Sequence, residues 1–384
     1  MENMQVRKED ALTHHTAACT KRESNIELFR IIVMLLIVAH HYVVNSGLYG
    51  VIQNTPLCLR SVFLLLFGAW GKTGINCFVL ISGYFMCQSK LTWRKFVKLL
   101  FEFQFYKLVF YICFLIAGYE SFSFARIIKV LAPITVVNTG FTGCYLLFLL
   151  LIPFLNILTK HMTQKQHLCL IAVVSFVYVG LGTLSVLTSF FPWFPTIGVT
   201  MNYVSWFVVL YFFGAYIRMY PKTIYENTKL WGWLTVLLLA ISVASVVACA
   251  YIGNMRGRVD IALSYAFLSD CSKVLAVAVA VCAFLFFRTL KIPYNKYINA
   301  AAASTYGVLL IHANSDAMRK WLWIDTLKNG QMFTSVWMPL HALGSVLVIF
   351  AVCIAIDRLR IRYIETPFLN WWDKLIEKRR NRCD

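Results

Sequence analysis

Long apolar segments recur along the whole chain, and short polar segments separate them. A helix needs about 20 apolar residues to cross the hydrocarbon core of a bilayer, and about ten segments come near this length. The predicted spans are residues 26–46, 68–88, 97–118, 141–159, 168–190, 201–218, 230–252, 269–287, 298–313 and 335–356. The strand alternation of outer-membrane barrels is absent. The pattern therefore predicts an all-α polytopic membrane protein.

Composition divides the chain into three parts. Residues 1–24 are polar and mixed in charge, so we expect a disordered cytoplasmic tail. Residues 25–368 form the predicted transmembrane domain, and residues 369–384 form a basic cytoplasmic tail. The apolar run from Ile127 to Val137 is too short to span a bilayer, so it is predicted to be an interfacial or re-entrant piece.

The distribution of lysine and arginine predicts the orientation in the membrane. With the N-terminus inside, 24 of the 36 lysines and arginines fall in cytoplasmic segments and eight in external loops. Cytoplasmic loops of membrane proteins carry such an excess of basic residues. We therefore expect both termini to be cytoplasmic.

Composition also excludes two classes of protein. The chain is 60% hydrophobic and 14% charged, whereas a soluble domain is about 25% charged. Its net charge of +19 suggests a nucleic-acid partner, but the basic residues lie where membrane topology would place them. The expected partner is therefore the lipid bilayer. The twelve cysteines are scattered without a CxxC pair, so no metal site is expected.

The first span contains an arginine and a histidine, which are unusual in an apolar helix. Arg30 and His41 are eleven residues apart, which is roughly 1100° of helical rotation and places both on one face. His40 lies roughly 80° away from that face. Ionisable residues inside a membrane are costly and mark functional sites by default. This helix is predicted to form one wall of a polar cavity.

Each residue of this face has a functional and a structural interpretation. Glu27 precedes Arg30 by three residues and can pair with it. Arg30 is then either an anchor for an anionic ligand or a snorkelling side chain with a surface counterion. His41 is either a neutral imidazole that acts as a base or a structural histidine.

Polar residues in the second and third spans extend the candidate site. Asn76 and Ser82 are predicted to hydrogen-bond between packed helices, and Tyr84 lies in the same segment. Arg94 and Lys95 follow on the cytoplasmic side, as ordinary positive-inside residues or as ligands of phosphates. Glu102 and Lys107 lie in the third span, too far apart to pair, so each needs a partner on another helix or a cavity.

Two further motifs lie near the C-terminus. The ninth span contains Tyr306 and ends at His312, near the predicted outer mouth. Glu365 follows the tenth span, and Pro367 is expected to end or kink that helix.

Taken in order, these motifs resemble the membrane-bound acyltransferase-3 family, the integral-membrane O-acyltransferases of bacterial surface glycans. The similar segments are Glu27 to His41, Phe78 to Tyr84, Ser304 to His312 and Glu365 to Pro367. The chain departs from the family at three places. Cys144-Tyr145 stands where Trp-Tyr or Trp-Phe is common, Cys77 where Phe is frequent, and Gly307 where Ser is frequent.

The resemblance implies an enzyme of the bacterial cytoplasmic (inner) membrane. It would transfer an acyl group, usually acetyl, from cytoplasmic acetyl-CoA to a hydroxyl of a cell-surface polysaccharide or its lipid-linked precursor. Acetyl-CoA would be a co-substrate, with no permanently bound cofactor.

The resemblance also implies roles for the candidate residues. His41 would act as base or acyl carrier, and Arg30 would hold the donor. The other residues divide into donor-binding Glu27, Arg94 and Lys95, oxyanion-binding Asn76, Ser82 and Tyr84, acceptor-side Tyr306 and His312, and structural Glu365.

Two other functions remain open. A transporter or flippase of a lipid-linked glycan also fits ten helices with buried charges, although no pair of related halves with interrupted helices is visible. A receptor-like or scaffold protein predicts that replacing Arg30 or His41 affects only stability.

Overall fold

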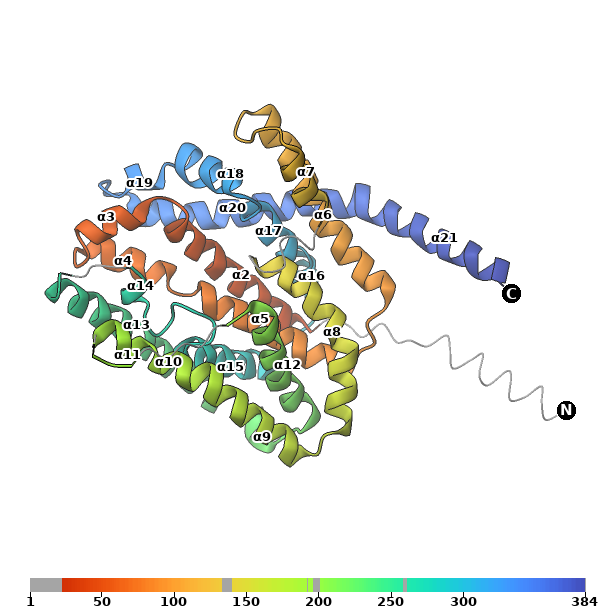
Figure 1. The fold of residues 1–384 in the computed structure, drawn as a ribbon, viewed down its shortest axis with the longest axis horizontal. Helices are drawn as coiled ribbons and strands as arrows, with labels where there is room; N and C mark the ends of the chain where they lie inside the picture. The colour runs from red at the N-terminus through yellow and green to blue at the C-terminus, as the bar shows by residue number, and fades with distance from the viewer. Residues whose placement is uncertain (1–22, 133–139, 192, 196–200, 258–260, 384) are drawn as a thin grey trace.

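The chain folds into a helical bundle (Figure 1), seen here in a computed structural model that describes residues 23–132, 140–191, 193–195, 201–257 and 261–383. The first half contains α2 (Ser24–Val44), α3 (Leu48–Asn54), α4 (Leu59–Gly68), α5 (Gly71–Met86), α6 (Trp93–Ile116), α7 (Phe124–Leu131), α8 (Phe141–His161), α9 (Gln164–Val174), the π-helix η2 (Ser175–Leu181), α10 (Gly182–Leu184) and α11 (Val186–Phe190). The second half contains α12 (Tyr203–Met219), the 3₁₀ turn η3 (Thr223–Glu226), α13 (Thr228–Met255), α14 (Ile261–Ser264), α15 (Val274–Thr289), α16 (Lys296–Ala303), α17 (Thr305–His312), α18 (Asp316–Arg319), the π-helix η4 (Lys320–Thr326), α19 (Asn329–Met332), α20 (Met338–Arg360), the π-helix η5 (Ile361–Glu365) and α21 (Thr366–Cys383).

The helices agree with the prediction of an all-α membrane protein. Among the described residues, seven helical stretches are long and apolar enough to cross a bilayer, and α12 and α15 are shorter apolar helices. The predicted second span is longer than expected, because α4 and α5 together run from Leu59 to Met86. The predicted span at 298–313 is not one helix, because α16 and α17 meet at a break at Ser304.

The bundle has two ends, and candidate polar residues lie at each of them. At one end, which we call the Asn25 end, the Asn25 side-chain amide donates to the carbonyls of Phe287 and Arg288. At the other, the His41 end, α2 finishes beside the end of α17 and the beginning of α5. The predicted topology makes the Asn25 end cytoplasmic and the His41 end external.

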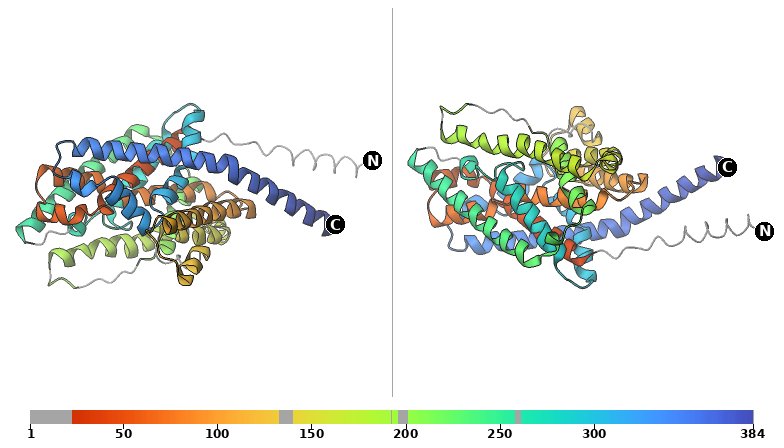
Figure 2. Two further views of the ribbon diagram at one scale, coloured as in Figure 1. Left: turned by 90° about the horizontal axis from the view of Figure 1, so that it is seen from above. Right: turned by 90° about the horizontal axis from the view of Figure 1, so that it is seen from below.

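The helix α7 lies outside the bundle in all three views (Figures 1 and 2). None of its residues is buried, and it is connected to α6 by a hydrogen bond from the Gln104 amide to the Val130 carbonyl. Residues 133–139, the rest of the predicted interfacial or re-entrant piece, lie outside the described residues. Most of the predicted N-terminal tail, residues 1–22, also lies outside them.

The helical path does not end at Pro367, as one alternative of the prediction had it. α20 continues through η5 into α21, and the path changes direction along this stretch (Figure 2). Pro367 is the second residue of α21 and has no N–H to donate to the preceding π-turn. The wider π-turn before it, where the Thr366 hydroxyl donates to the Ile361 carbonyl, accommodates the proline ring.

Two glycines let α5 and α12 approach closely. A Cβ atom on Gly83 would lie 2.7 Å from the Cα of Tyr211, and one on Gly214 would lie 2.6 Å from the backbone nitrogen of Tyr84. Small residues at such crossings allow helices to pack in a membrane, where no hydrophobic effect drives them together. This crossing packs α12 against α5, which carries three of the predicted site residues, Asn76, Ser82 and Tyr84.

We expect Gly214→Ala to destabilise the protein by about 1–3 kcal/mol, because backbone atoms, unlike a flexible side chain, cannot move away from the new methyl group. The measurement is thermal unfolding of the detergent-solubilised protein. Gly344→Ala in α20 is the matched control, since a Cβ there meets no atom within 4 Å. Equal melting temperatures for the two variants would show that the close crossing does not limit stability.

Candidate active site

A cavity of about 910 Å³ opens at the His41 end of the bundle. Its walls come from the end of α2, the beginning of α5, the outer part of α6, α7, the beginning of α8, and the α17–α18 region. His40 and His41 line it together with a set of basic residues. The prediction that the first span forms one wall of a polar cavity is therefore correct for the end of α2 that carries His40 and His41.

A hydrogen-bonded row of two groups, the His312 ring and the Val308 carbonyl, orients the ring of His41. The Nδ1 atom of His41 lies 2.9 Å from Nε2 of His312, and Nδ1 of His312 lies 2.6 Å from the carbonyl oxygen of Val308. A carbonyl oxygen only accepts hydrogen bonds, so His312 donates through Nδ1 and its neutral Nε2 accepts. His41 must then donate through Nδ1. This arrangement leaves Nε2 of His41 as an unprotonated acceptor, which is the state a general base requires.

His312 is buried, with 1% of its surface exposed, and it lies in the last turn of α17. Sequence reasoning placed it near the outer mouth but did not pair it with His41. The sequence contains a signal for this pair, because the first and the ninth predicted spans each have a histidine near the end that the predicted topology places on the same side of the membrane. Spacing along one helix cannot detect such a pair.

His40 lies on the same cavity but is held differently. Its Nδ1 atom is 2.6 Å from the carbonyl oxygen of Gly68, and its ring centroid is 5.7 Å from that of His41. A Cβ on Gly71 would lie 2.3 Å from the His40 ring, so only glycine fits at the start of α5. The cavity extends around more than one face of α2 at its end, so both His40 and His41 line it although they lie on different faces.

Arg30 lies deeper and does not line the cavity. Its guanidinium is 3.4 Å from the Glu27 carboxylate, and its side chain is 28% exposed. The eleven residues between Arg30 and His41 correspond to roughly 16 Å along the helix axis. The predicted pair of Glu27 and Arg30 forms, but Arg30 and His41 occupy different depths.

A layer of hydroxyl groups lies at the depth of Arg30. The Tyr145 hydroxyl is 2.9 Å from the Ser82 hydroxyl, and the Tyr145 ring lies 6.2 Å from the Tyr306 ring. The Tyr306 hydroxyl is buried and has no hydrogen-bond partner among the described residues. Arg30 is close enough to Tyr145 to interact with it electrostatically. The sequence motifs single out Ser82 and Tyr306 but give no role to Tyr145, which follows the departing Cys144 and itself agrees with the Trp-Tyr form of the family motif.

The structure places Asn76 and Tyr84 away from His41. The Asn76 amide donates to the Cys271 carbonyl at 2.8 Å and accepts from the Trp206 indole at 2.8 Å, and the side chain is fully buried. These contacts support its interpretation as a packing residue. Tyr84 lies at the Asn25 end and accepts a hydrogen bond from Arg218 at 2.9 Å.

The comparisons with known proteins agree with this arrangement of motifs. The sequence model of the acyltransferase-3 family, described as an acyltransferase domain, matches residues 23–358. The chain belongs to this family. Neither the curated proteins nor the solved structures contain a match to the chain. Membership makes the protein a multi-pass acyltransferase.

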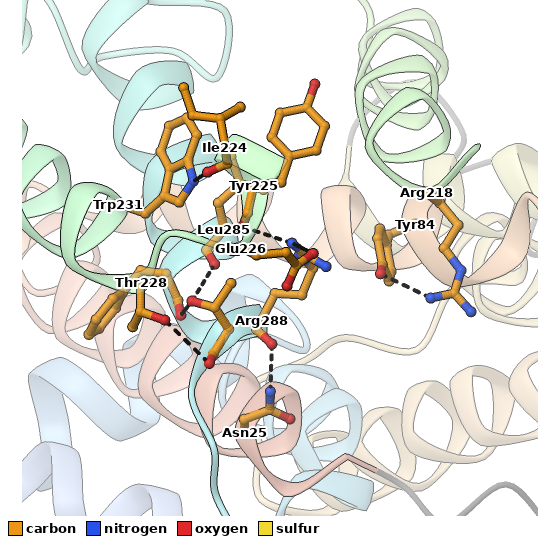
Figure 3. A network of polar contacts seen from close by, with 12 residues as sticks. Asn25, Tyr84, Arg218, Ile224, Tyr225, Glu226, Thr228, Trp231, Leu285 and Arg288 are labelled. Carbon is orange, nitrogen blue, oxygen red and sulfur yellow. Dashed lines mark hydrogen bonds and ion pairs between the residues drawn. The ribbon is translucent and has the colours of Figure 1, made fainter. Parts of the chain in front are cut away.

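A polar network at the Asn25 end of this acyltransferase joins several helices (Figure 3). The Arg288 guanidinium donates to the Tyr225 carbonyl at 2.8 Å and to the Glu226 carboxylate at 2.7 Å. Arg218 lies over the ring of Tyr84, 4.9 Å from its centroid. In the sequence both arginines are only positive-inside residues, and packing alone places Tyr84 between α12 and α15.

Two of the predicted donor-binding residues, Arg94 and Lys95, lie near this end on the outside of the bundle, whereas Glu27 is buried in α2. Arg94 at the start of α6 donates through Nε to both carboxylate oxygens of Asp373, each at 3.0 Å. Both side chains are about half exposed, so their ion pair is weak and easily exchanged. Lys95, the next residue in α6, is also exposed.

A buried ionic cluster ties α6 to the end of α20. The Arg360 guanidinium lies 3.1 Å from the Glu102 carboxylate, 2.9 Å from that of Asp357 and 2.6 Å from that of Glu365. The expectation that Glu102 needs a partner on another helix is confirmed. Glu365, predicted to be structural, also pairs with Lys98 at 3.0 Å.

Gly307, where the family often has serine, lies against this cluster. A Cβ at position 307 would lie 2.3 Å from the Asp357 carboxyl group. The Tyr106 hydroxyl donates to the same carboxylate at 2.8 Å. The departure from the family at this position therefore makes room for a buried carboxylate of this chain.

Proposed function

We propose that this acyltransferase moves an acetyl group from cytoplasmic acetyl-CoA to a hydroxyl of a cell-surface polysaccharide or its lipid-linked precursor, in the bacterial inner membrane. The observation that carries the proposal is the hydrogen-bonded row from His41 through His312 to Val308. It fixes the tautomer in which Nε2 of His41 is free to accept a proton, inside a cavity that can admit a sugar.

In the proposed reaction the acceptor hydroxyl donates a hydrogen bond to Nε2 of His41. The hydroxyl oxygen attacks the thioester carbonyl carbon while its proton passes to Nε2. The carbon–sulfur bond then breaks, and the departing thiolate takes the proton from His41 to leave as free CoA. In the alternative with an acyl carrier, Nε2 attacks the thioester carbonyl carbon, the carbon–sulfur bond breaks and CoA departs as the thiolate. The acceptor hydroxyl oxygen then attacks the acetyl carbon, the bond to Nε2 breaks, and the hydroxyl proton passes to the thiolate to give free CoA.

The depth of the residues suggests where the donor lies. Arg30 holds a phosphate of the donor, because a guanidinium binds phosphate with two parallel hydrogen bonds. The pantetheine arm then extends from Arg30 toward the cavity, past the hydroxyls of Ser82, Tyr145 and Tyr306. The Tyr306 hydroxyl, which has no partner among the described residues, can donate to the developing oxyanion in place of Asn76 and Tyr84, which other contacts occupy. The Ser82 hydroxyl donates to the Phe78 carbonyl, so the Tyr145 hydroxyl donates to Ser82.

We expect Arg30→Ala to raise the KM for acetyl-CoA by about 10- to 100-fold, since a hydrogen bond to a charged group contributes about 1.5–3 kcal/mol. The measurement is initial rate against acetyl-CoA concentration in proteoliposomes. Arg60→Ala, an exposed residue at the other end of the bundle, is the matched control. An unchanged KM in Arg30→Ala would assign this arginine to the surface role of a snorkelling side chain.

We expect His312→Ala to lower kcat by about 10- to 100-fold, as removal of a residue that orients another histidine does. His312→Gln should recover part of the loss, because a glutamine side-chain oxygen can accept from Nδ1 of His41. The measurement is kcat for acetyl transfer at saturating donor. If both variants lose activity equally while remaining folded, hydrogen bonding to His41 is not the role of His312.

The whole proposal is tested by the O-acetyl content of surface glycan in a strain that lacks the protein and in the complemented strain. We expect acetylation to disappear and return. Altered glycan export with unchanged acetylation would instead support the transporter or flippase.

A further inference from the structure

The cavity at the His41 end is strongly basic. Among the described residues, six lysines and arginines line it against two carboxylates, those of Glu120 and Asp316. The six are Lys72, Lys107, Arg126, Lys129, Arg319 and Lys320. A site with an excess of four positive charges attracts an anion and concentrates it near the two histidines.

The two carboxylates are already paired. Glu120 forms an ion pair with Arg126, and Asp316 pairs with Arg319 at 2.8 Å. The Lys107 ammonium lies 5.2 Å from the centroid of the Phe103 ring and forms no ion pair with any residue that the structure describes. The carboxylates of the cavity therefore do not neutralise Lys107.

Two buried polar atoms in the cavity wall lack partners. The Tyr111 hydroxyl and Nε of Arg319 are shielded from solvent and hydrogen-bond to none of the described residues. Buried donors without partners cost free energy, so such groups in a cavity wall point to a ligand. Arg319 is also close enough to His41 and His312 to interact electrostatically with both.

The predicted topology also supports a binding role for these charges. External loops carry few basic residues, and the predicted ones hold only eight lysines and arginines. Four of those eight, Arg126, Lys129, Arg319 and Lys320, line this one cavity. Orientation in the membrane does not account for basic residues there, whereas binding of an anionic ligand does.

We propose that the cavity binds an acceptor sugar that carries a carboxylate or phosphate close to the hydroxyl that is acylated. Lys107 and Arg319 hold the anionic group, the Tyr111 hydroxyl donates to it, and the hydroxyl lies at His41. The assignment to the acceptor rests on the proposed function, in which the donor enters from the Asn25 end. The basic cavity itself does not depend on that function.

The test compares 4-nitrophenyl β-D-glucuronide with 4-nitrophenyl β-D-glucoside, which differ in a carboxylate. Binding to the full-length protein in nanodiscs is measured by isothermal titration calorimetry, and acetyl transfer from acetyl-CoA is measured in parallel. Glucose 1-phosphate is a second probe that distinguishes a phosphate from a carboxylate site. The variants are Lys107→Gln and Lys320→Gln. Lys229→Gln is the control, because Lys229 is exposed and its replacement removes the same charge outside the cavity.

We expect an anionic probe to bind at least about tenfold more tightly than the glucoside at low salt, and the difference to shrink in 0.5 M salt through screening. Lys107→Gln should remove most of this preference, while Lys229→Gln leaves it unchanged. Anionic preference in binding without acetyl transfer to any probe would support the cavity and count against the proposed acceptor chemistry.

Three results would overturn the inference. The first is equal binding of the neutral and anionic probes. The second is acetyl transfer to the glucoside at the same kcat/KM as to the glucuronide, which would leave the proposed function intact. The third is a rise in KM for acetyl-CoA in Lys107→Gln with acceptor binding unchanged, which would assign the basic cavity to the phosphates of the donor.

Discussion

Replacement of His41 by alanine is expected to lower kcat for acetyl transfer by about 100- to 10,000-fold, the range typical for loss of a general base. Every other group near the acceptor remains, but no atom at this position can accept the hydroxyl proton. The alternative in which His41 carries the acetyl group predicts a loss at least as large. The measurement is transfer of labelled acetyl from acetyl-CoA in proteoliposomes.

Two histidine variants make this result specific. His161→Ala is the control for expression and folding, because His161 is exposed at the end of α8. His40→Ala is expected to change kcat only several-fold, because the contact of Nδ1 with the Gly68 carbonyl holds that ring and no second histidine orients it. Full activity in a well-folded His41→Ala protein would make His41 structural and refute the proposed mechanism.

Replacement of Arg360 by leucine is expected to destabilise the protein by about 3–5 kcal/mol, because it leaves buried carboxylates without their counterion. The Arg360 side chain is 2% exposed and pairs with three carboxylates, those of Glu102, Asp357 and Glu365. Among the described residues, Lys98 is the one cation that still pairs with the cluster in this variant. The variant should appear as a lower melting temperature and a lower yield of monodisperse protein.

Two controls separate burial from charge. Lys98→Gln is expected to cost about 1 kcal/mol or less, because the Lys98 side chain is 42% exposed and water screens its pair with Glu365. Adding Glu102→Gln to Arg360→Leu should recover part of the stability, since one uncompensated charge disappears. A melting temperature of Arg360→Leu equal to that of the wild type would show that the carboxylates are neutral without the arginine.

Parts of the candidate site could be predicted because they depend on one helix or on the cost of burying charge. The spacing of Glu27 and Arg30 predicts their pair, which forms. The isolated position of Glu102 in an apolar span predicts a partner elsewhere, and Arg360 is that partner. These predictions succeed because helical geometry and desolvation act locally.

Other parts could not be predicted from spacing. His40 and His41 point in different directions on α2, yet both line the cavity, because the cavity is formed by the surrounding helices. Asn76 has the chemistry of an oxyanion donor, but Trp206 and Cys271 occupy its amide. Tyr145 lies at a family motif position, but only packing places its hydroxyl beside Ser82.

The sequence by itself determined the helical class, the membrane environment and the family, because hydropathy and ordered motifs are properties of the linear chain. The tertiary structure alone decided which chemical groups meet. His41 and His312 are 271 residues apart, and their hydrogen bond exists only because α2 and α17 pack together. The basic cavity likewise combines side chains from several helices, and its charge becomes apparent only when the folded chain brings them to one end of the bundle.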